Sequence, residues 1–159
     1  MCGVGALLES WPDVIAIHDR RIPGSRANID HIAVAANGVH VIDPKRYTGE
    51  VRRRDVGSFF RSDERLYVGS RDRSHLVDGV VRQMSEVRKV LADHPDVTIF
   101  GALCFVDADW RLFSRPFVID GVWVGWPEAL RSYVSGTGPL TQDVRQSLAS
   151  SIISSLPAA

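Results

Sequence analysis

Asn28-Ile-Asp-His-Ile-Ala-Val-Ala-Ala-Asn-Gly-Val-His-Val-Ile-Asp-Pro-Lys45 is the most informative stretch of the sequence. Two alternating, β-branched runs flank Asn37-Gly38, a dipeptide that favours a two-residue type I′ hairpin turn because both residues tolerate a positive φ. With this dipeptide at the centre of the turn, Asp30 pairs with Lys45, and Asp43 is the diagonal neighbour of Asp30. Since strand side chains alternate between faces, all three charged residues are predicted to lie on one face of the hairpin.

Two carboxylates and one ammonium group therefore gather at one end of a face that is otherwise apolar. The predicted separation of Asp30 and Asp43 is roughly 5–7 Å, which allows both carboxylates to bind one cation. Burying these charges without partners would be costly. The residues alone leave two interpretations open: an Asp30–Lys45 ion pair at the sheet margin, or a metal site that uses both aspartates.

The motif Asn28-Ile-Asp-His31, followed by Val41-Ile-Asp-Pro-Lys-Arg-Tyr-Thr-Gly49, resembles the NERD (nuclease-related) domain. That family belongs to the PD-(D/E)xK nuclease superfamily. The resemblance extends back over residues 18–24, forward to Gln83 and, more loosely, over most of the chain. It implies one NERD-like domain over residues 1–159 with an α/β fold. The expected core is restriction-endonuclease-like. It has three layers, a mixed β-sheet flanked by helices on both faces, and its elements follow the chain order αβββαβ.

The resemblance also implies metal-dependent hydrolysis of phosphodiester bonds, with nucleic acid, in the first place DNA, as the substrate. Asp30 and Asp43 would hold Mg²⁺ or Mn²⁺, hard cations that prefer oxygen ligands, and the main-chain carbonyl of Pro44 would add a ligand. Lys45 would orient the attacking water and stabilise the transition state. Gln83 matches a glutamine on the following helix that supports the active site in related nucleases.

Two features depart from the family pattern. The family carries a glutamate on its first helix, and the nearby candidate here, Glu9, lies toward the end of that helix. Pro44 removes a ladder donor from its strand, so we expect an edge position or a bulge there. The alternative function is a catalytically degenerate nucleic-acid-binding or regulatory module with the same fold. A protein-interaction domain that uses Trp110, Trp123 and Trp126 ranks third, since these tryptophans suit core strands equally well.

The composition limits how the protein could contact nucleic acid. The 159 residues carry no net charge, so binding must come from a local patch, and the expected phosphate contacts are Arg46, Arg52 and Arg54. No apolar run reaches the length of a membrane span and no signal peptide is evident, which predicts a cytoplasmic protein without a membrane partner. Cys2 and Cys104 suggest neither a disulfide framework nor a metal site. The oligomeric state is left open.

The remaining pattern predicts the order of the elements. An i, i+3, i+4 apolar stripe marks a helix over residues 72–94, and the run over 97–106 is apolar enough to form a central strand, parallel to the one before the helix. His31 should face away from Asp30 and act as a supporting residue rather than a ligand, and His18 should be structural. The other expected elements are helices within 3–11, 127–135 and 141–156, and strands within 14–18, 50–56, 66–68 and 117–126.

Overall fold

The computed structural model describes residues 3–159, so Cys2 lies outside the described residues. Its elements are, in chain order, α1 (Val4–Glu9), β1 (Ile15–Arg21), β2 (Asn28–Ala35), β3 (Gly38–Lys45), β4 (Val51–Asp55), β5 (Glu64–Val68), β6 (Arg71–Asp72), α2 (His75–Val90), β7 (Ile99–Phe105), β8 (Phe117–Ile119), β9 (Val122–Gly125), α3 (Pro127–Tyr133) and α4 (Gln142–Ser155). Each predicted helix and strand is present, with ends that differ by a few residues.

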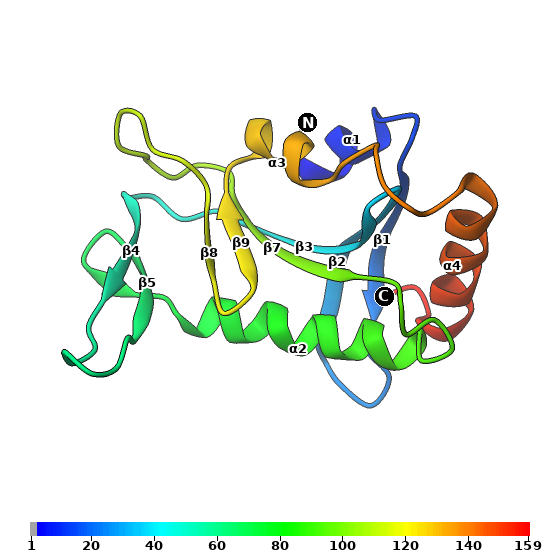
Figure 1. Ribbon diagram of the computed structural model, residues 1–159, viewed down its shortest axis with the longest axis horizontal. Helices are drawn as coiled ribbons and strands as arrows, with labels where there is room; N and C mark the ends of the chain where they lie inside the picture. The colour runs from blue at the N-terminus through cyan, green and yellow to red at the C-terminus, as the bar shows by residue number, and fades with distance from the viewer. Residues whose placement is uncertain (1–2) are drawn as a thin grey trace.

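A six-stranded mixed sheet forms the centre of the molecule, in the order β1-β2-β3-β7-β9-β8 (Figure 1). β1, β2 and β3 are antiparallel, whereas β3 pairs with β7 in parallel after the crossover through α2. Helices α1 and α3 cover one face of this sheet, and α2 and α4 cover the other. The predicted three-layer α/β arrangement with a mixed sheet is therefore confirmed.

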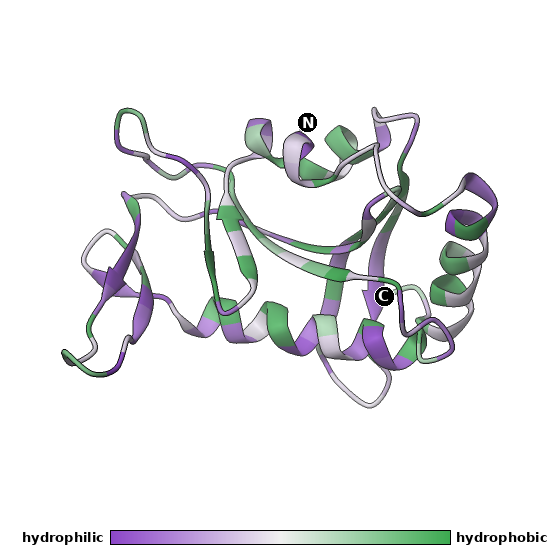
Figure 2. Ribbon diagram, in the orientation of Figure 1, coloured by the Kyte–Doolittle hydropathy of each residue, from purple (hydrophilic) through white to green (hydrophobic). Residues whose placement is uncertain are grey.

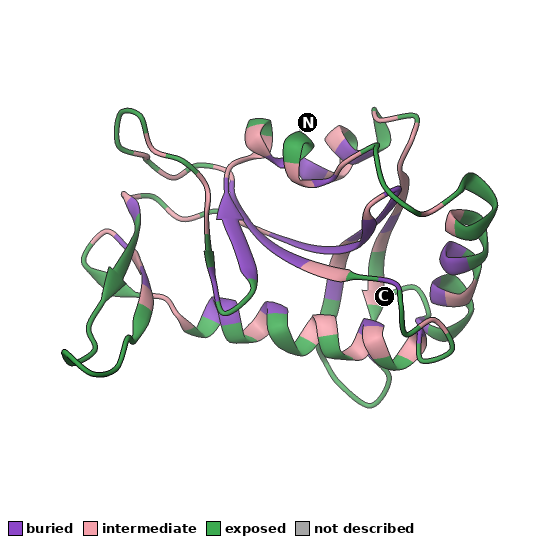
Figure 3. Cartoon of the chain, in the orientation of Figure 1, coloured by how far each residue is buried: buried purple, intermediate pink, exposed green. Residues whose placement is uncertain are grey.

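Apolar side chains fill both interfaces between sheet and helices. The clusters beneath α2 and α4 include Ile32, Val34, Val39 and Val41, while Ala33, Ala35 and Ile42 belong to the cluster beneath α1 and α3. The alternation along β2 and β3 thus sends successive residues to opposite helical layers. Figure 3 shows that β3, β7 and β9 are largely buried, and Figure 2 shows that β8 and β9 are largely hydrophobic, whereas β4 and β5 are hydrophilic and mostly exposed.

The β2–β3 hairpin differs from the predicted register by two residues. Ala35 pairs with Gly38, so the two-residue turn is Ala36-Asn37 rather than Asn37-Gly38, and neither turn residue has the positive φ that a type I′ turn needs. Asn37 is instead held by tertiary contacts: its Nδ2 donates to Tyr133 O at 3.0 Å, and its Oδ1 accepts from Ser135 N at 3.3 Å. These contacts override the local preference of the dipeptide.

β4, β5 and β6 form a separate three-stranded sheet that projects from one end of the molecule, at the left of Figure 1. Its inner face carries Val51, Leu66 and Val68, which pack with α2 and β7 in one core cluster. Its outer face is polar. The predicted strand over residues 50–56 is therefore antiparallel, as expected, but it pairs with β5 and not with the central sheet.

Within residues 3–159, no helix combines the length and apolar character needed to span a bilayer.

Candidate active site and metal centre

Asp43 is the centre of the candidate site. It lies near the end of β3 on the face that α2 covers, and only 5% of its surface is exposed. Lys45 is two residues further along the same strand and therefore on the same face, and its Nζ lies 3.0 Å from Asp43 Oδ1. A buried carboxylate and a half-exposed ammonium group are thus held together by strand periodicity alone.

Asp30 approaches Asp43 from β2. The last recorded β2–β3 pair is His31 with Ile42, and the same register continued by one residue sets Asp30 opposite Asp43. Burial raises the pKa of the Asp43 carboxyl, the hydrogen bond and charge of Lys45 act against this rise, and the charge of Asp30 adds to it. The two carboxylates are therefore electrostatic neighbours, and Asp30 lies directly opposite Asp43 rather than diagonal to it as predicted.

The predicted partner of Lys45 was wrong. The expected pairing put Lys45 opposite Asp30, but the two-residue shift in register removes that pair, and Lys45 binds Asp43 instead. A shift of two residues leaves every side chain on its predicted face, because strand side chains alternate with period two. Asp30, Asp43 and Lys45 therefore still share the face covered by α2.

Gln83 enters the same site from α2. A groove of about 510 Å³ between α2 and the end of β3 is lined by Asp43, Lys45 and Gln83 together. Within residues 3–159, the buried Oε1 of Gln83 has no hydrogen-bond partner. An unpaired buried amide oxygen is costly, and its place in the groove leaves it free to accept a hydrogen bond from, or to ligate, a bound group.

The position of α2 depends on a glycine in β7. A side chain at Gly101 would collide with Val80 and Met84 of α2, so the helix can lie this close to the sheet only because position 101 has no Cβ. Gln83 is adjacent to Met84 in the helix. The close packing at Gly101 therefore helps to set the depth at which the Gln83 amide enters the groove.

Pro44 lies at a local edge of the sheet, as the missing N–H requires. Val39 N donates to Thr98 O and Lys45 O accepts from Val106 N, so the odd-numbered residues of β3 turn their backbone groups toward β7. Pro44 consequently turns toward β2, two residues beyond the last β2–β3 pair. Its carbonyl is therefore not used by the β7 ladder and lies on the side from which Asp30 approaches.

The opposite face of the sheet carries a different polar group. Glu9 Oε1 lies 3.1 Å from His18 Nε2, and His18 Nδ1 lies 2.8 Å from His31 Nδ1. Burial, and secondarily the charge of His18, lower the pKa of His31. Glu9 is thus occupied on the side of α1, away from Asp43, and His31 faces away from Asp30 as predicted.

The oxygen donors fit a hard divalent cation. Within the described chain, 3–159, no group of three or more His, Cys, Asp and Glu side chains is placed to hold a metal ion. Two carboxylates, the free Gln83 oxygen and the Pro44 carbonyl remain as donors, and Mg²⁺ typically takes one or two carboxylates and keeps several waters. The donor set is therefore sparse but chemically suited to Mg²⁺ or Mn²⁺.

The three predicted phosphate-binding arginines lie outside this groove. Arg46 Nη1 binds Asp107 Oδ2 at 2.8 Å, on the segment just after β3. Arg52 and Arg54 share the outer face of β4, where their guanidinium carbons lie 5.7 and 5.5 Å from the centroid of the Tyr67 ring. Arg53 turns to the other face, where its guanidinium carbon lies 5.6 Å from the centroid of the Phe117 ring, so the three consecutive arginines do not share one face.

Several residues that line the groove were not predicted. On α2 they are His75, Gly79, Arg82 and Glu86, which follow one another at spacings of four, three and four residues. That spacing places them on one helical surface and could have identified them from the sequence. The residues contributed by the loop before β2 carry no comparable pattern.

Comparison with known protein families gives a match over most of the chain. The family model described as "NERD: Nuclease-related domain" matches residues 4–106, a span that runs from α1 to β7 and contains Asp30, Asp43, Lys45 and Gln83. No curated protein and no solved structure gives a significant match to the chain.

Proposed function

The chain belongs to the nuclease-related domain family, and we propose that it is a metal-dependent nuclease that hydrolyses phosphodiester bonds in DNA. The observation that carries this proposal is one groove that contains the buried Asp43 carboxylate, the Lys45 ammonium group and the free Gln83 oxygen. Asp30 adds a second carboxylate beside Asp43. Oxygen ligands, a cation and an open groove are what phosphodiester hydrolysis requires.

Asp30 and Asp43 would hold Mg²⁺ or Mn²⁺, with the Gln83 amide oxygen and the Pro44 carbonyl as further ligands. Such an ion, when bound, lowers the pKa of a water molecule and neutralises charge on the phosphate. Lys45 would orient the attacking water and stabilise the extra negative charge of the transition state, a role supported by its distance of 3.0 Å from Asp43. Arg46, Arg52 and Arg54 would contact phosphates along the bound strand.

A nucleic-acid-binding module without catalysis is the second candidate. It is favoured by the sparse donor set, because Glu9 lies on the other face of the sheet and no third carboxylate joins Asp30 and Asp43 within residues 3–159. Such a module would bind DNA through its arginines and leave the phosphodiester bonds intact.

The test is a cleavage assay on plasmid and single-stranded DNA with Mg²⁺ or Mn²⁺. We expect metal-dependent cleavage by the wild-type protein, and loss of at least roughly a hundredfold in rate for Asp43→Ala and Lys45→Ala, as removal of a charge-stabilising group typically causes. Asp93→Ala, an exposed aspartate past the end of α2, is the matched control and should cleave normally. Absence of cleavage with intact DNA binding would instead establish the second candidate.

A further inference from the structure

A second groove, of about 450 Å³, lies between β4 and the loop that precedes β8. Five arginines line it: Arg52, Arg53, Arg54, Arg111 and Arg115. Glu50 is the single acidic residue among the described residues that line it. Since the whole chain has no net charge, this is a local concentration of positive charge that favours a polyanionic ligand.

Several of these arginines are free to bind an external anion. Arg111 contacts Glu50 at 3.4 Å, and Arg53 contacts Glu64 at 3.7 Å. Over residues 3–159, no carboxylate forms an ion pair with Arg52, Arg54 or Arg115. Arg52 and Arg54 stack over Tyr67, which does not line the groove, and Arg52 Nη2 also donates to Gly69 O at 3.4 Å. The remaining N–H groups at the edges of the two guanidinium groups are available for phosphate oxygens.

Exposed aromatic side chains stand on both segments that form the groove. Phe59 and Phe60, on the loop that follows β4, are 96% and 94% exposed. Leu112 and Phe113, on the loop that precedes β8, are 85% and 91% exposed. Both loops lie at the left of Figure 1, the loop before β8 at the upper corner and the loop after β4 at the lower corner. Single exposed apolar residues are common, but each of these two pairs follows residues that line the basic groove, Arg54 in one case and Arg111 in the other, which indicates a binding surface.

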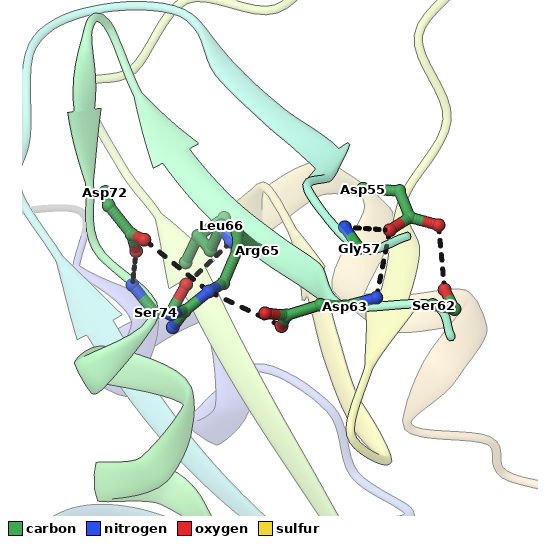
Figure 4. A network of polar contacts seen from close by, with 8 residues as sticks. All are labelled: Asp55, Gly57, Ser62, Asp63, Arg65, Leu66, Asp72 and Ser74. Carbon is green, nitrogen blue, oxygen red and sulfur yellow. Dashed lines mark hydrogen bonds and ion pairs between the residues drawn. The ribbon is translucent and has the colours of Figure 1, made fainter. Parts of the chain in front are cut away.

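Hydrogen bonds to the Asp55 carboxylate order the loop that carries Phe59 and Phe60 (Figure 4). Asp55 Oδ1 accepts hydrogen bonds from Gly57 N and Asp63 N, both at 2.9 Å, and its Oδ2 accepts from Ser62 Oγ at 2.8 Å. The turn is closed by Arg61 N, which donates to Ser58 O at 3.2 Å. The two phenylalanines are therefore held in solvent by an ordered loop, which lowers the entropy lost when they bind a partner.

We propose that this groove binds a single-stranded segment of nucleic acid, with phosphates on the arginines and unpaired bases stacked on Phe59, Phe60 and Phe113. A basic groove combined with exposed aromatic rings is the arrangement that recognises single strands, because every unpaired base offers a free π-face. In a duplex those faces are already stacked on neighbouring bases. The groove thus selects single-stranded regions, flaps or frayed ends over intact duplex.

This proposal rests on the proposed nuclease function, since it defines the substrate of the same protein. Six residues of chain connect Lys45 to Val51 at the edge of the groove, which limits their separation to about 20 Å. A strand held on the arginines is therefore only a few nucleotides from the Asp43 site.

The test measures affinity for a fluorescein-labelled single strand and for the matching duplex, by anisotropy in EDTA so that no cleavage occurs. We expect the intact wild-type protein to bind the single strand roughly tenfold or more tightly than the duplex, and the double variant Phe59→Ala/Phe60→Ala to lose roughly tenfold in single-strand affinity. Arg115→Ala should weaken single-strand binding as well. Ile153→Ala, on α4, and Arg21→Ala, on the opposite sheet edge, are matched controls and should bind normally.

Two results would overturn the proposal: equal or tighter binding of duplex, or unchanged single-strand affinity in the phenylalanine variant. Binding of that variant to phosphatidylserine vesicles is measured in parallel, and a loss there with unchanged DNA affinity would assign the loop to a membrane surface and also overturn it. Cleavage is scored separately. Groove-dependent binding without cleavage would refute the proposed nuclease activity and support single-strand binding by the groove. Cleavage without groove-dependent binding would support the nuclease activity and refute single-strand binding by the groove.

Discussion

Asp43 is held in an unfavourable environment for a carboxylate. Burial raises its pKa and the neighbouring charge of Asp30 raises it further, so its ionised form is disfavoured in the folded protein. We expect Asp43→Asn to increase the free energy of unfolding at neutral pH by roughly 1 kcal/mol in metal-free buffer, the scale typical of relieving strain at a functional site. Urea denaturation of this variant, with Asp93→Asn as the control, measures the difference.

Added metal should make the wild-type protein more stable than Asp43→Asn, the opposite of the order expected in metal-free buffer. A cation that binds only the folded state stabilises it in proportion to the logarithm of its concentration above Kd. Mn²⁺ should therefore raise the Tm of the wild-type protein and of Asp93→Asn, and should leave the Tm of Asp43→Asn nearly unchanged. Equal Tm shifts in all three proteins would argue against Asp43 as a metal ligand.

His40 gives the stability a defined pH dependence. Burial lowers its pKa to about 3, while in the unfolded chain the imidazole titrates at the ordinary value of 6.5. Between these values the unfolded state binds the additional proton, so stability is lost as the pH falls below 6.5, by up to ~1.4 kcal/mol per pH unit. His40→Leu should reduce this slope by up to ~1.4 kcal/mol per pH unit, the contribution of one proton. Urea titrations over this pH range give the slopes.

The β2–β3 hairpin shows, at the scale of an element, what sequence can and cannot predict. Alternation alone placed Asp30, Asp43 and Lys45 on one face, and this prediction held because a shift of two residues preserves the faces. The register itself was missed because Asn37 acts through α3 and the segment after it, which lie about a hundred residues away in sequence. Turn propensity contains no information on such contacts.

Asn37 should therefore matter more for tertiary packing than for the turn. Its amide satisfies Tyr133 O, and its Oδ1 accepts from His40 Nε2 at 2.8 Å. Asn37→Ala leaves these buried partners unpaired, and we expect a loss of about 2–3 kcal/mol in the free energy of unfolding. Asn28→Ala, at the exposed start of β2, is the control. An effect no larger than that of the control in urea denaturation would show that the Asn37 bonds are not maintained in solution.

The loop over residues 55–63 is a second element that rests on one side chain. The hydrogen bonds from Asp63 N and Gly57 N, followed by that from Ser62, lower the pKa of the Asp55 carboxyl, which shows that they favour its charged form. Asp55→Ala should leave the fold intact but increase hydrogen exchange at the Gly57 and Asp63 amides and weaken single-strand binding several-fold. Asp93→Ala is the matched control, and unchanged exchange rates would show that Asp55 does not order the loop.

At the scale of the whole molecule, positive charge is concentrated in one region although the chain has no net charge. Residues 46–73 contain eight arginines and five acidic residues, although positive and negative charges balance over the whole sequence. Arg52 and Arg54 were predictable as members of a run, but Arg111 and Arg115 join them from a loop some sixty residues later. Only the fold brings the two basic segments together, so the groove could not be predicted from either one.

This concentration of charge predicts how binding responds to salt. A protein without net charge has no long-range attraction to DNA, so the salt dependence must come from the phosphates that local arginines neutralise. Each contact to a single strand contributes about 0.7 to the slope of log K against log salt, so Arg52→Ala/Arg54→Ala should reduce the slope by roughly 1.4. Arg21→Ala removes a positive charge at the opposite sheet edge and should leave the slope unchanged. A reduction of about 0.7 in Arg21→Ala, the value for one charge, would mean that binding follows total charge rather than the arginines of β4.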